Sequence, residues 1–171
     1  DTLSIARDPD LRWLALTTAA AALVRGLFAW LEPTKSWNDS AIYRDSARQL
    51  IESGRIDSDL VMPLYPALIG LVGWSRILAL QLVLSSACVV LVYLLAVRVF
   101  DDRRIARVAA LLMAFEPLSI YYANQRLTET LYAFLLLAAL LALSGRRYAL
   151  GSVCFVASIL VRPVLDVVGP L

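Results

Sequence analysis

The chain has 171 residues, of which 60% are hydrophobic and 18% are charged. Soluble domains average roughly 45–50% apolar and roughly 25% charged residues, so this composition is typical of a membrane protein. The 16 basic and 14 acidic residues give a net charge of +2, which excludes the strongly basic surface expected of a nucleic-acid-binding protein. The sequence contains no histidine, so any acid–base chemistry has to rest on carboxylates, tyrosine or lysine.

The first apolar run covers residues 13–31 and contains a single charge, Arg25. A helix of about 20 residues is needed to cross the hydrocarbon core of a membrane, so this run predicts a first membrane span. It is too long for a signal peptide and has no small-residue cleavage site. We therefore expect it to stay in the protein as a membrane anchor.

The predicted outer loop over residues 32–76 contains a stretch, "NDSAIYRDSARQLIESG", whose apolar side chains recur at helical spacing. This pattern predicts an amphipathic helix over residues 39–53 that lies on the membrane surface. We expect Asn38 or Asp39 to be its N-cap and Gly54 to end it.

The rest of the chain alternates apolar runs with short polar turns. A run over residues 64–74 is interrupted by proline and glycine, and it predicts a short or re-entrant segment. Longer runs predict four more spans over residues 77–97, 105–122, 127–143 and 148–161. We therefore expect an all-α integral membrane protein with about five spans, the surface helix, and one membrane domain over residues 1–171. The two cysteines lie inside apolar runs and are expected to pack there.

Arginines are distributed unevenly over the turns between the predicted spans. Six lie in the turns after residues 97 and 143, whereas the turn between these two contains only Arg126. Cytoplasmic turns carry an excess of Lys and Arg, so we expect the two arginine-rich turns and the N-terminus inside. The loop over residues 32–76 and the C-terminal segment are then outside, and the expected location is a bacterial inner membrane.

Most ionisable residues in or beside the predicted spans lie on the outer side of this topology. They are Arg25, Asp39, Glu116, Arg126, Glu129, Arg162 and Asp166. Such groups are functional candidates because a charge is costly in the membrane. Guanidinium groups bind phosphate through paired hydrogen bonds, and a carboxylate can accept a proton from an attacking hydroxyl. The set predicts transfer of a group from a phosphate-bearing lipid.

Each of these candidates also has a structural explanation. Asp39 can serve only as a helix cap, and Arg25 can extend its charged end to the interface. Glu116 can pair with an arginine, and the helix dipole favours an acid at Glu129. Oxygen ligands such as Asp39 or Glu129 would suit a hard cation, so a divalent metal stays open as a cofactor and no metal ligand is assigned.

The ordered motifs resemble a known family. They are "DSAIYRDSARQLIESG", "MPLYPALIGLVGW", "RVFDDRRIARVAALLMAFEPLSIYYA", "TETLYAFLLLAALLAL" and "ILVRP". Together they resemble the N-terminal half of the polyprenyl-phosphate-dependent glycosyltransferases with the GT-C fold, a group that includes protein O-mannosyltransferases and lipid A aminoarabinose transferases. The resemblance covers about residues 13 to 165. Many members have Asp-Glu where this chain has Asp39-Ser40.

The resemblance implies an enzyme that moves a sugar from a polyprenyl monophosphate to a hydroxyl of a lipid, glycan or protein at the outer membrane face. It also implies that Asp39 is the catalytic base and that Glu129 is the second acidic position. Charge and topology, rather than the resemblance, assign Arg25, Arg126 and Arg162 to the lipid phosphate.

Members of the family have more spans than this chain, so we expect it to be completed by further spans or a partner subunit. Two other functions stay open. One is a non-catalytic GT-C-like membrane module that binds a lipid or a partner enzyme, and the other is a small transporter subunit.

Overall fold

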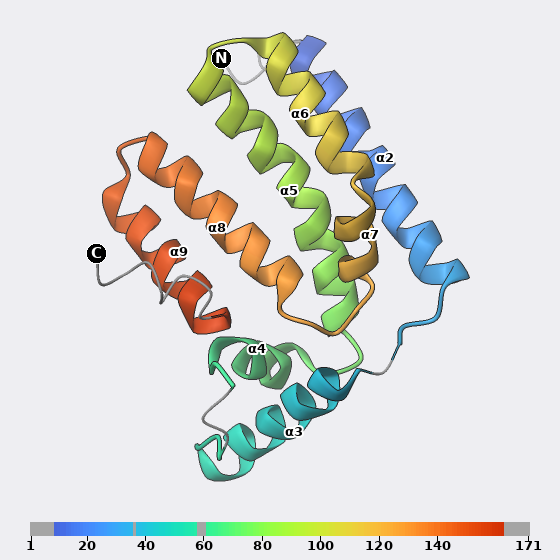
Figure 1. Cartoon of the computed structure of the whole chain (residues 1–171), viewed down its shortest axis with the longest axis vertical. Coiled ribbons are helices and arrows are strands. Elements are labelled where there is room, and N and C mark those ends of the chain that lie inside the picture. The colour runs from blue at the N-terminus through green and yellow to red at the C-terminus, as the bar shows by residue number, and fades with distance from the viewer. Residues whose placement is uncertain (1–8, 36, 58–60, 163–171) are drawn as a thin grey trace.

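The computed structural model describes residues 9–35, 37–57 and 61–162, and the predicted outer acid Asp166 lies outside them. Every regular element within these residues is an α-helix, as predicted. In chain order the helices are α2 (Pro9–Leu31), α3 (Asn38–Ser53), α4 (Leu64–Val72), α5 (Ile77–Phe100), α6 (Arg103–Phe115), α7 (Pro117–Ala123), α8 (Glu129–Ser144) and α9 (Tyr148–Val161). The longer helices form a bundle, and α3 and α4 lie across one end of it (Figure 1).

Within the described residues, two or three helices could cross a membrane, fewer than the five predicted. Helices α2 and α5 are long and apolar enough, and α6 with α7 makes a third candidate if the pair is one span bent by 49°. Helices α8 and α9 have 16 and 14 residues. At 1.5 Å per residue they reach about 24 and 21 Å, which is shorter than a hydrocarbon core of about 30 Å.

Helix α5 is central and packs against α2, α6 and α8. On α6, Ala106, Ala110 and Ala114 follow one another at intervals of four residues, and all three are fully buried against α2 and α5. Small side chains let helix backbones approach closely, which is how apolar helices associate where no water drives their packing. Large apolar side chains such as Leu16 and Leu23 face outward instead, each 72% exposed.

An ion-pair cluster joins α2 to α6 at the end of the bundle far from α3. The Asp10 carboxylate accepts hydrogen bonds from the guanidinium groups of Arg103 and Arg107. The Arg107 guanidinium also lies 5.8 Å from the centre of the Trp13 ring. These contacts fix the relative position of the two helix ends at the arginine-rich turns.

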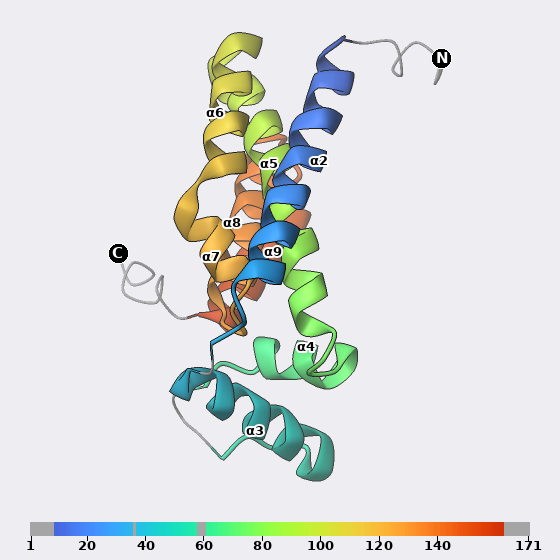
Figure 2. The ribbon, with the colours of Figure 1, turned by 90° about the vertical axis from the view of Figure 1, so that its right-hand side faces the viewer.

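The surface helix and the short helix stack on each other at the opposite end, as the second view also shows (Figure 2). Gly54 ends α3 with a left-handed backbone, φ 70°, as the sequence predicts. The run over residues 64–74 forms the nine-residue helix α4. Ala47 of α3 and Ile69 of α4 are buried in one apolar cluster with Leu131 of α8, which holds the pair against the bundle.

Candidate functional site

A buried polar loop between α7 and α8 forms the base of the candidate site. Asn124, Gln125 and Thr128 are 2%, 2% and 4% exposed. The Asn124 amide donates to the Glu32 carbonyl oxygen at 2.8 Å, and Trp37 Nε1 donates to Gln125 Oε1 at 3.0 Å. These hydrogen bonds tie the start of the outer loop to this end of the bundle. In the sequence the loop reads only as a short turn, so its role was missed.

Asp39 lies in the first turn of α3 with an exposed side chain. The prediction that Asn38 or Asp39 is the N-cap is wrong, because Trp37 occupies that position. The backbone N–H of Trp37 donates to Ser40 Oγ at 3.2 Å, so the serine three residues after the N-cap satisfies this N–H at the start of the helix. The Asp39 carboxylate is therefore not used as a cap, and it stands where a hydroxyl group from outside can reach it.

Glu129 and Arg162, predicted separately at the ends of two spans, form an ion pair. Arg162 Nη1 donates to Glu129 Oε1 at 2.8 Å, and the side chains are 42% and 28% exposed. Glu129 is the first residue of α8 and Arg162 directly follows α9, so the antiparallel packing of the two helices brings them together. Glu129 also lines a mainly apolar cavity of about 250 Å³ between α5, α7 and α8.

Two tyrosines, one on α3 and one on α4, pack against each other near the two acids. The rings of Tyr43 and Tyr65 meet edge to face with their centres 5.1 Å apart. Burial raises the pKa of Tyr43 above its usual value, and a hydrogen bond to Thr128 opposes that shift. The negative charges of Asp39 and Glu129 raise the pKa further. Both carboxylates are thus near enough to Tyr43 for their charges to affect its hydroxyl.

Three buried polar atoms beside these tyrosines have no hydrogen-bond partner among the described residues. They are the Tyr65 hydroxyl, Gln81 Oε1 and Glu129 Oε2. Gln81 and the Glu129 charge both affect the pKa of the Tyr65 hydroxyl, although no hydrogen bond to that hydroxyl has the usual distance and angle. Nearly all buried polar groups in proteins are bonded to protein or water. Because these three atoms are buried, polar ligand atoms can bond to them only when the site opens around the ligand.

A pocket of about 150 Å³ adjoins α3 on its N-terminal side and collects three cations: Lys35, Arg44 and Arg126. The Arg126 guanidinium stacks on the Trp74 ring with 4.7 Å to its centre, and Arg44 lies 5.8 Å from the same centre. Arg126 Nε donates to the Trp74 carbonyl oxygen at 3.4 Å, and burial lowers the pKa of Arg126. We call the set Lys35, Arg44, Arg126 and Trp74 the cationic pocket.

Charge and size make the cationic pocket suitable for one phosphate group. Ser40 and Thr34 also line it and add hydroxyl groups to the three cations. Of these residues only Arg126 was predicted. Lys35 and Arg44 looked like ordinary charges of a polar loop, and the position of Trp74 beneath them depends on how α4 folds back against α3.

Arg25 is held elsewhere, at the break between α6 and α7. It is fully buried, and its five N–H groups make five hydrogen bonds within the protein. Two of the acceptors are the carbonyl oxygens of Met113 and Ala114, at 3.1 and 2.8 Å. Pro117 has no N–H to donate to Met113, so Arg25 supplies a donor that the helix lacks.

Glu116 stabilises the same break between α6 and α7 by capping α7. Its carboxylate accepts hydrogen bonds from the backbone N–H groups of Leu118, at 2.9 Å, and Ser119, which makes it the N-cap of α7. Arg25 and Glu116 thus stabilise the bend between two helices. The role of Arg25 toward a lipid phosphate stays a prediction, and the site described above does not include it.

Within the described residues, no group of three or more His, Cys, Asp or Glu side chains is arranged to hold a metal ion. The divalent cation left open by the sequence therefore has no ligand set assigned to it here.

No protein-family model matches the chain, and the comparisons with curated proteins and with solved structures found no match either. The resemblance to GT-C glycosyltransferases rests on the sequence motifs alone, and the function has to be argued from the geometry of the site.

Proposed function

We propose that the chain is a GT-C-like glycosyltransferase membrane domain, or a portion of one, that transfers a sugar from a polyprenyl monophosphate to a hydroxyl acceptor. The acceptor is a lipid, a glycan or a protein, and the reaction takes place at the outer face of a bacterial inner membrane. The proposal includes the five-span topology, with the short helices α8 and α9 accommodated by local thinning of the bilayer.

The observation that carries this proposal is the group of unpaired polar atoms beside two carboxylates and a cationic pocket. The Tyr65 hydroxyl, Gln81 Oε1 and Glu129 Oε2 lack partners within the described part of the chain. A sugar presents many hydroxyl groups that can bond to such atoms. The cationic pocket lies on the same end of the bundle and suits the phosphate that carries the sugar.

In the proposed reaction, Asp39 accepts the proton of the acceptor hydroxyl as the oxygen attacks the anomeric carbon of the sugar. The bond between that carbon and the phosphate oxygen breaks, and its electrons leave with the lipid phosphate. Arg126, with Lys35 and Arg44, stabilises the phosphate charge. Glu129 binds the sugar through its unpaired oxygen, while the ion pair with Arg162 holds the carboxylate in place.

A second function, a non-catalytic module that binds a polyprenyl phosphate for a partner enzyme, is favoured by one observation. Glu129 is already paired with Arg162 at 2.8 Å. If that pair persists with ligand bound, only Asp39 is left to act as a base. Binding without transfer is the outcome expected from this second function.

A comparison of Asp39→Asn with Glu52→Gln tests the proposal. Both acids lie on α3 and both are exposed, but Glu52 is at the far end of the helix and pairs with Arg48. Membranes containing each variant receive a labelled hexose on a polyprenyl monophosphate, and label transferred to membrane acceptors is counted. We expect Asp39→Asn to lower transfer by about 100-fold or more, since general base catalysis contributes 10²–10⁴-fold. Glu52→Gln should leave transfer unchanged.

Donor binding, followed by quenching of Trp74 fluorescence, separates the two functions. Unchanged binding with lost transfer in Asp39→Asn supports the base. Full transfer activity in that variant would show that Asp39 is not the base. Binding by the unmodified chain with no transfer in any preparation would favour the non-catalytic module.

A further inference from the structure

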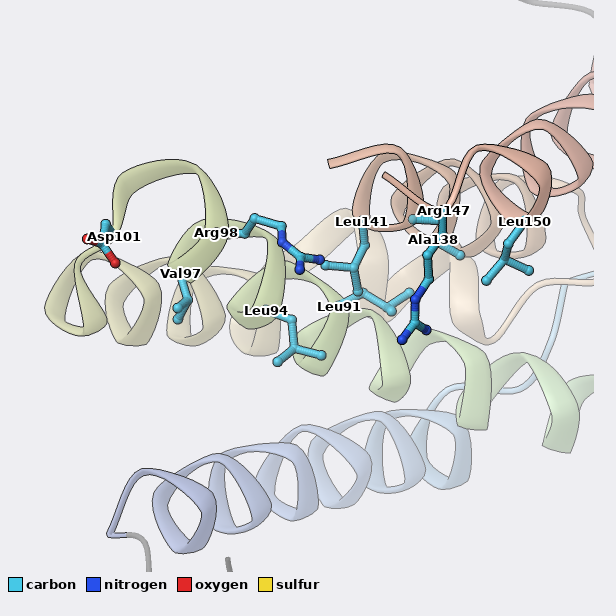
Figure 3. A pocket seen from close by; sticks show the side chains of 10 residues that line it. Leu91, Leu94, Val97, Arg98, Asp101, Ala138, Leu141, Arg147 and Leu150 are labelled. Atoms are coloured by element: carbon cyan, nitrogen blue, oxygen red, sulfur yellow. The ribbon is translucent and has the colours of Figure 1, made fainter. Parts of the chain in front are cut away.

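A second pocket lies at the arginine-rich end of the bundle, far from the candidate site. It has a volume of about 650 Å³ and lies between α5, α8 and the start of α9. Figure 3 shows the side chains that line it. We call it the α5–α9 groove. Seven of its ten lining residues are apolar, and the other three are Arg98, Asp101 and Arg147.

Arg98 reaches across the α5–α9 groove from α5 to the turn between α8 and α9. A Cβ atom placed on Gly145 in that turn would lie 2.7 Å from Arg98 Nη1, so the guanidinium rests directly on the glycine. Arg147 follows in the same turn and begins α9. Guanidinium groups from two different elements therefore line the same mainly apolar groove (Figure 3).

Neither guanidinium makes an ion pair with an acid in the described part of the chain. Asp101 lines the same pocket, so the three charged residues give a net charge of +1. A wholly apolar segment covering the groove would bury two unpaired cations, which is costly. The occupant that fits has to supply a negative charge at the mouth and hydrocarbon along the walls.

We propose that the α5–α9 groove binds one anionic glycerophospholipid. The phosphate lies between Arg98 and Arg147, which bind it through paired N–H groups, and an acyl chain lies along Leu94, Leu141 and Leu150. Basic pockets between membrane helices on the cytoplasmic side bind anionic headgroups, and the positive-inside rule puts this end of the bundle in the cytoplasm. Asp101 favours a headgroup with a single negative charge over one with two.

This inference rests on the chain being a membrane protein and does not depend on sugar transfer. Helix α3, which lines the cationic pocket, and the turn between α8 and α9, which lines the α5–α9 groove, lie at opposite ends of the structure (Figure 1). A variant in one is not expected to change ligand binding in the other, so the two proposals can fail separately.

Native mass spectrometry of the chain in a lipid-free non-ionic detergent tests the inference. Dioleoyl phosphatidylglycerol and dioleoyl phosphatidylcholine are added at equal concentrations, and bound lipids are counted. An arginine near a membrane surface contributes about 1 kcal/mol toward an anionic lipid, which is about five-fold in affinity. We expect preferential retention of one phosphatidylglycerol, and a loss of about 20-fold in its affinity in Arg98→Gln/Arg147→Gln.

A matched control is Arg12→Gln/Arg104→Gln, which removes two exposed cations from the same end of the bundle without touching the α5–α9 groove. It should keep phosphatidylglycerol. Leu94→Trp fills the apolar part of the groove and leaves the arginines, so it should also lose the lipid. Circular dichroism and elution as a single species check the folding of each variant. If the double glutamine variant does not fold, the loss of lipid in Leu94→Trp tests the inference in its place.

Equal retention of the two lipids would overturn the inference. Equal losses in the control and in Arg98→Gln/Arg147→Gln would also overturn it, because surface charge in general would then explain the binding. A dimer whose formation excludes the lipid would show that a second copy of the chain, and not a lipid, covers the groove.

Discussion

Replacing Arg25 with methionine should destabilise the protein strongly, because the arginine side chain donates hydrogen bonds to carbonyl oxygens at the break between α6 and α7. The change removes the donors to the Met113 and Ala114 carbonyl oxygens, which lie in the last turn of α6. A buried acceptor left without a partner costs about 1–3 kcal/mol. Two such acceptors predict a loss of about 2–6 kcal/mol in the free energy of unfolding, and the lost hydrogen bonds to Ser85 and Ser119 add to it.

Unfolding by SDS in mixed micelles, followed by circular dichroism, measures this loss. Arg12→Met is the control, because Arg12 is an exposed arginine on the same helix. A surface substitution of this kind changes stability by about 0.5 kcal/mol or less. A loss in Arg25→Met no larger than in Arg12→Met would refute the role assigned to the buried arginine.

A double-mutant cycle with Pro117→Ala makes the test specific. Alanine at position 117 has a backbone N–H that can donate to the Met113 carbonyl oxygen. In the parent chain this oxygen accepts a hydrogen bond from Arg25 instead. Pro117→Ala should therefore recover about 1 kcal/mol of the loss caused by Arg25→Met. Strictly additive effects of the two substitutions would mean that Arg25 does not replace the missing N–H.

Two further predictions concern the site and the packing of the bundle. Burial raises the pKa values of Tyr43 and Tyr65, so the unfolded chain releases these protons first. The contribution of these two tyrosines to the free energy of unfolding should be constant below about pH 10 and should fall as the pH rises above it. Tyr65→Phe should make this fall less steep. An unchanged slope in that variant would contradict the burial of the hydroxyl. Gly151 packs so closely on α8 that an added Cβ would lie 2.6 Å from the Leu143 side chain. Gly151→Leu should lower stability by about 1–3 kcal/mol in SDS unfolding, and a variant as stable as the parent chain would show that α8 and α9 can separate without cost.

The site and the helix break use similar residues for different purposes. Arg25 and Arg126 are both arginines near the ends of predicted spans. Arg25 has every N–H group bonded inside the protein, whereas Arg126 stacks on Trp74 at the edge of a pocket. The acids divide in the same way, since Glu116 caps α7 and Glu129 keeps one oxygen unpaired. The proposed mechanism uses Arg126 and Glu129 and does not use Arg25 or Glu116.

The sequence by itself determined where the helices lie and that they are strongly apolar. The run predicted over residues 148–161 is α9, and the surface helix predicted over 39–53 is α3 within one residue. These predictions depend on the spacing of apolar side chains and on glycine and proline, which act over a few residues. Among the described residues, two or three helices are long and apolar enough to cross a membrane, fewer than the five predicted, because α8 and α9 have only 16 and 14 residues.

Only the tertiary structure decided which polar groups have hydrogen-bond or ion-pair partners within the protein and which can bind a ligand. Arg25 finds a partner in Ser85, 60 residues away, and Glu129 finds one in Arg162, 33 residues away. The cationic pocket likewise joins Lys35 and Arg126, which lie on segments far apart in the chain. No local pattern contains such pairings, because a hydrogen bond depends on distances of about 3 Å that exist only after the helices have packed.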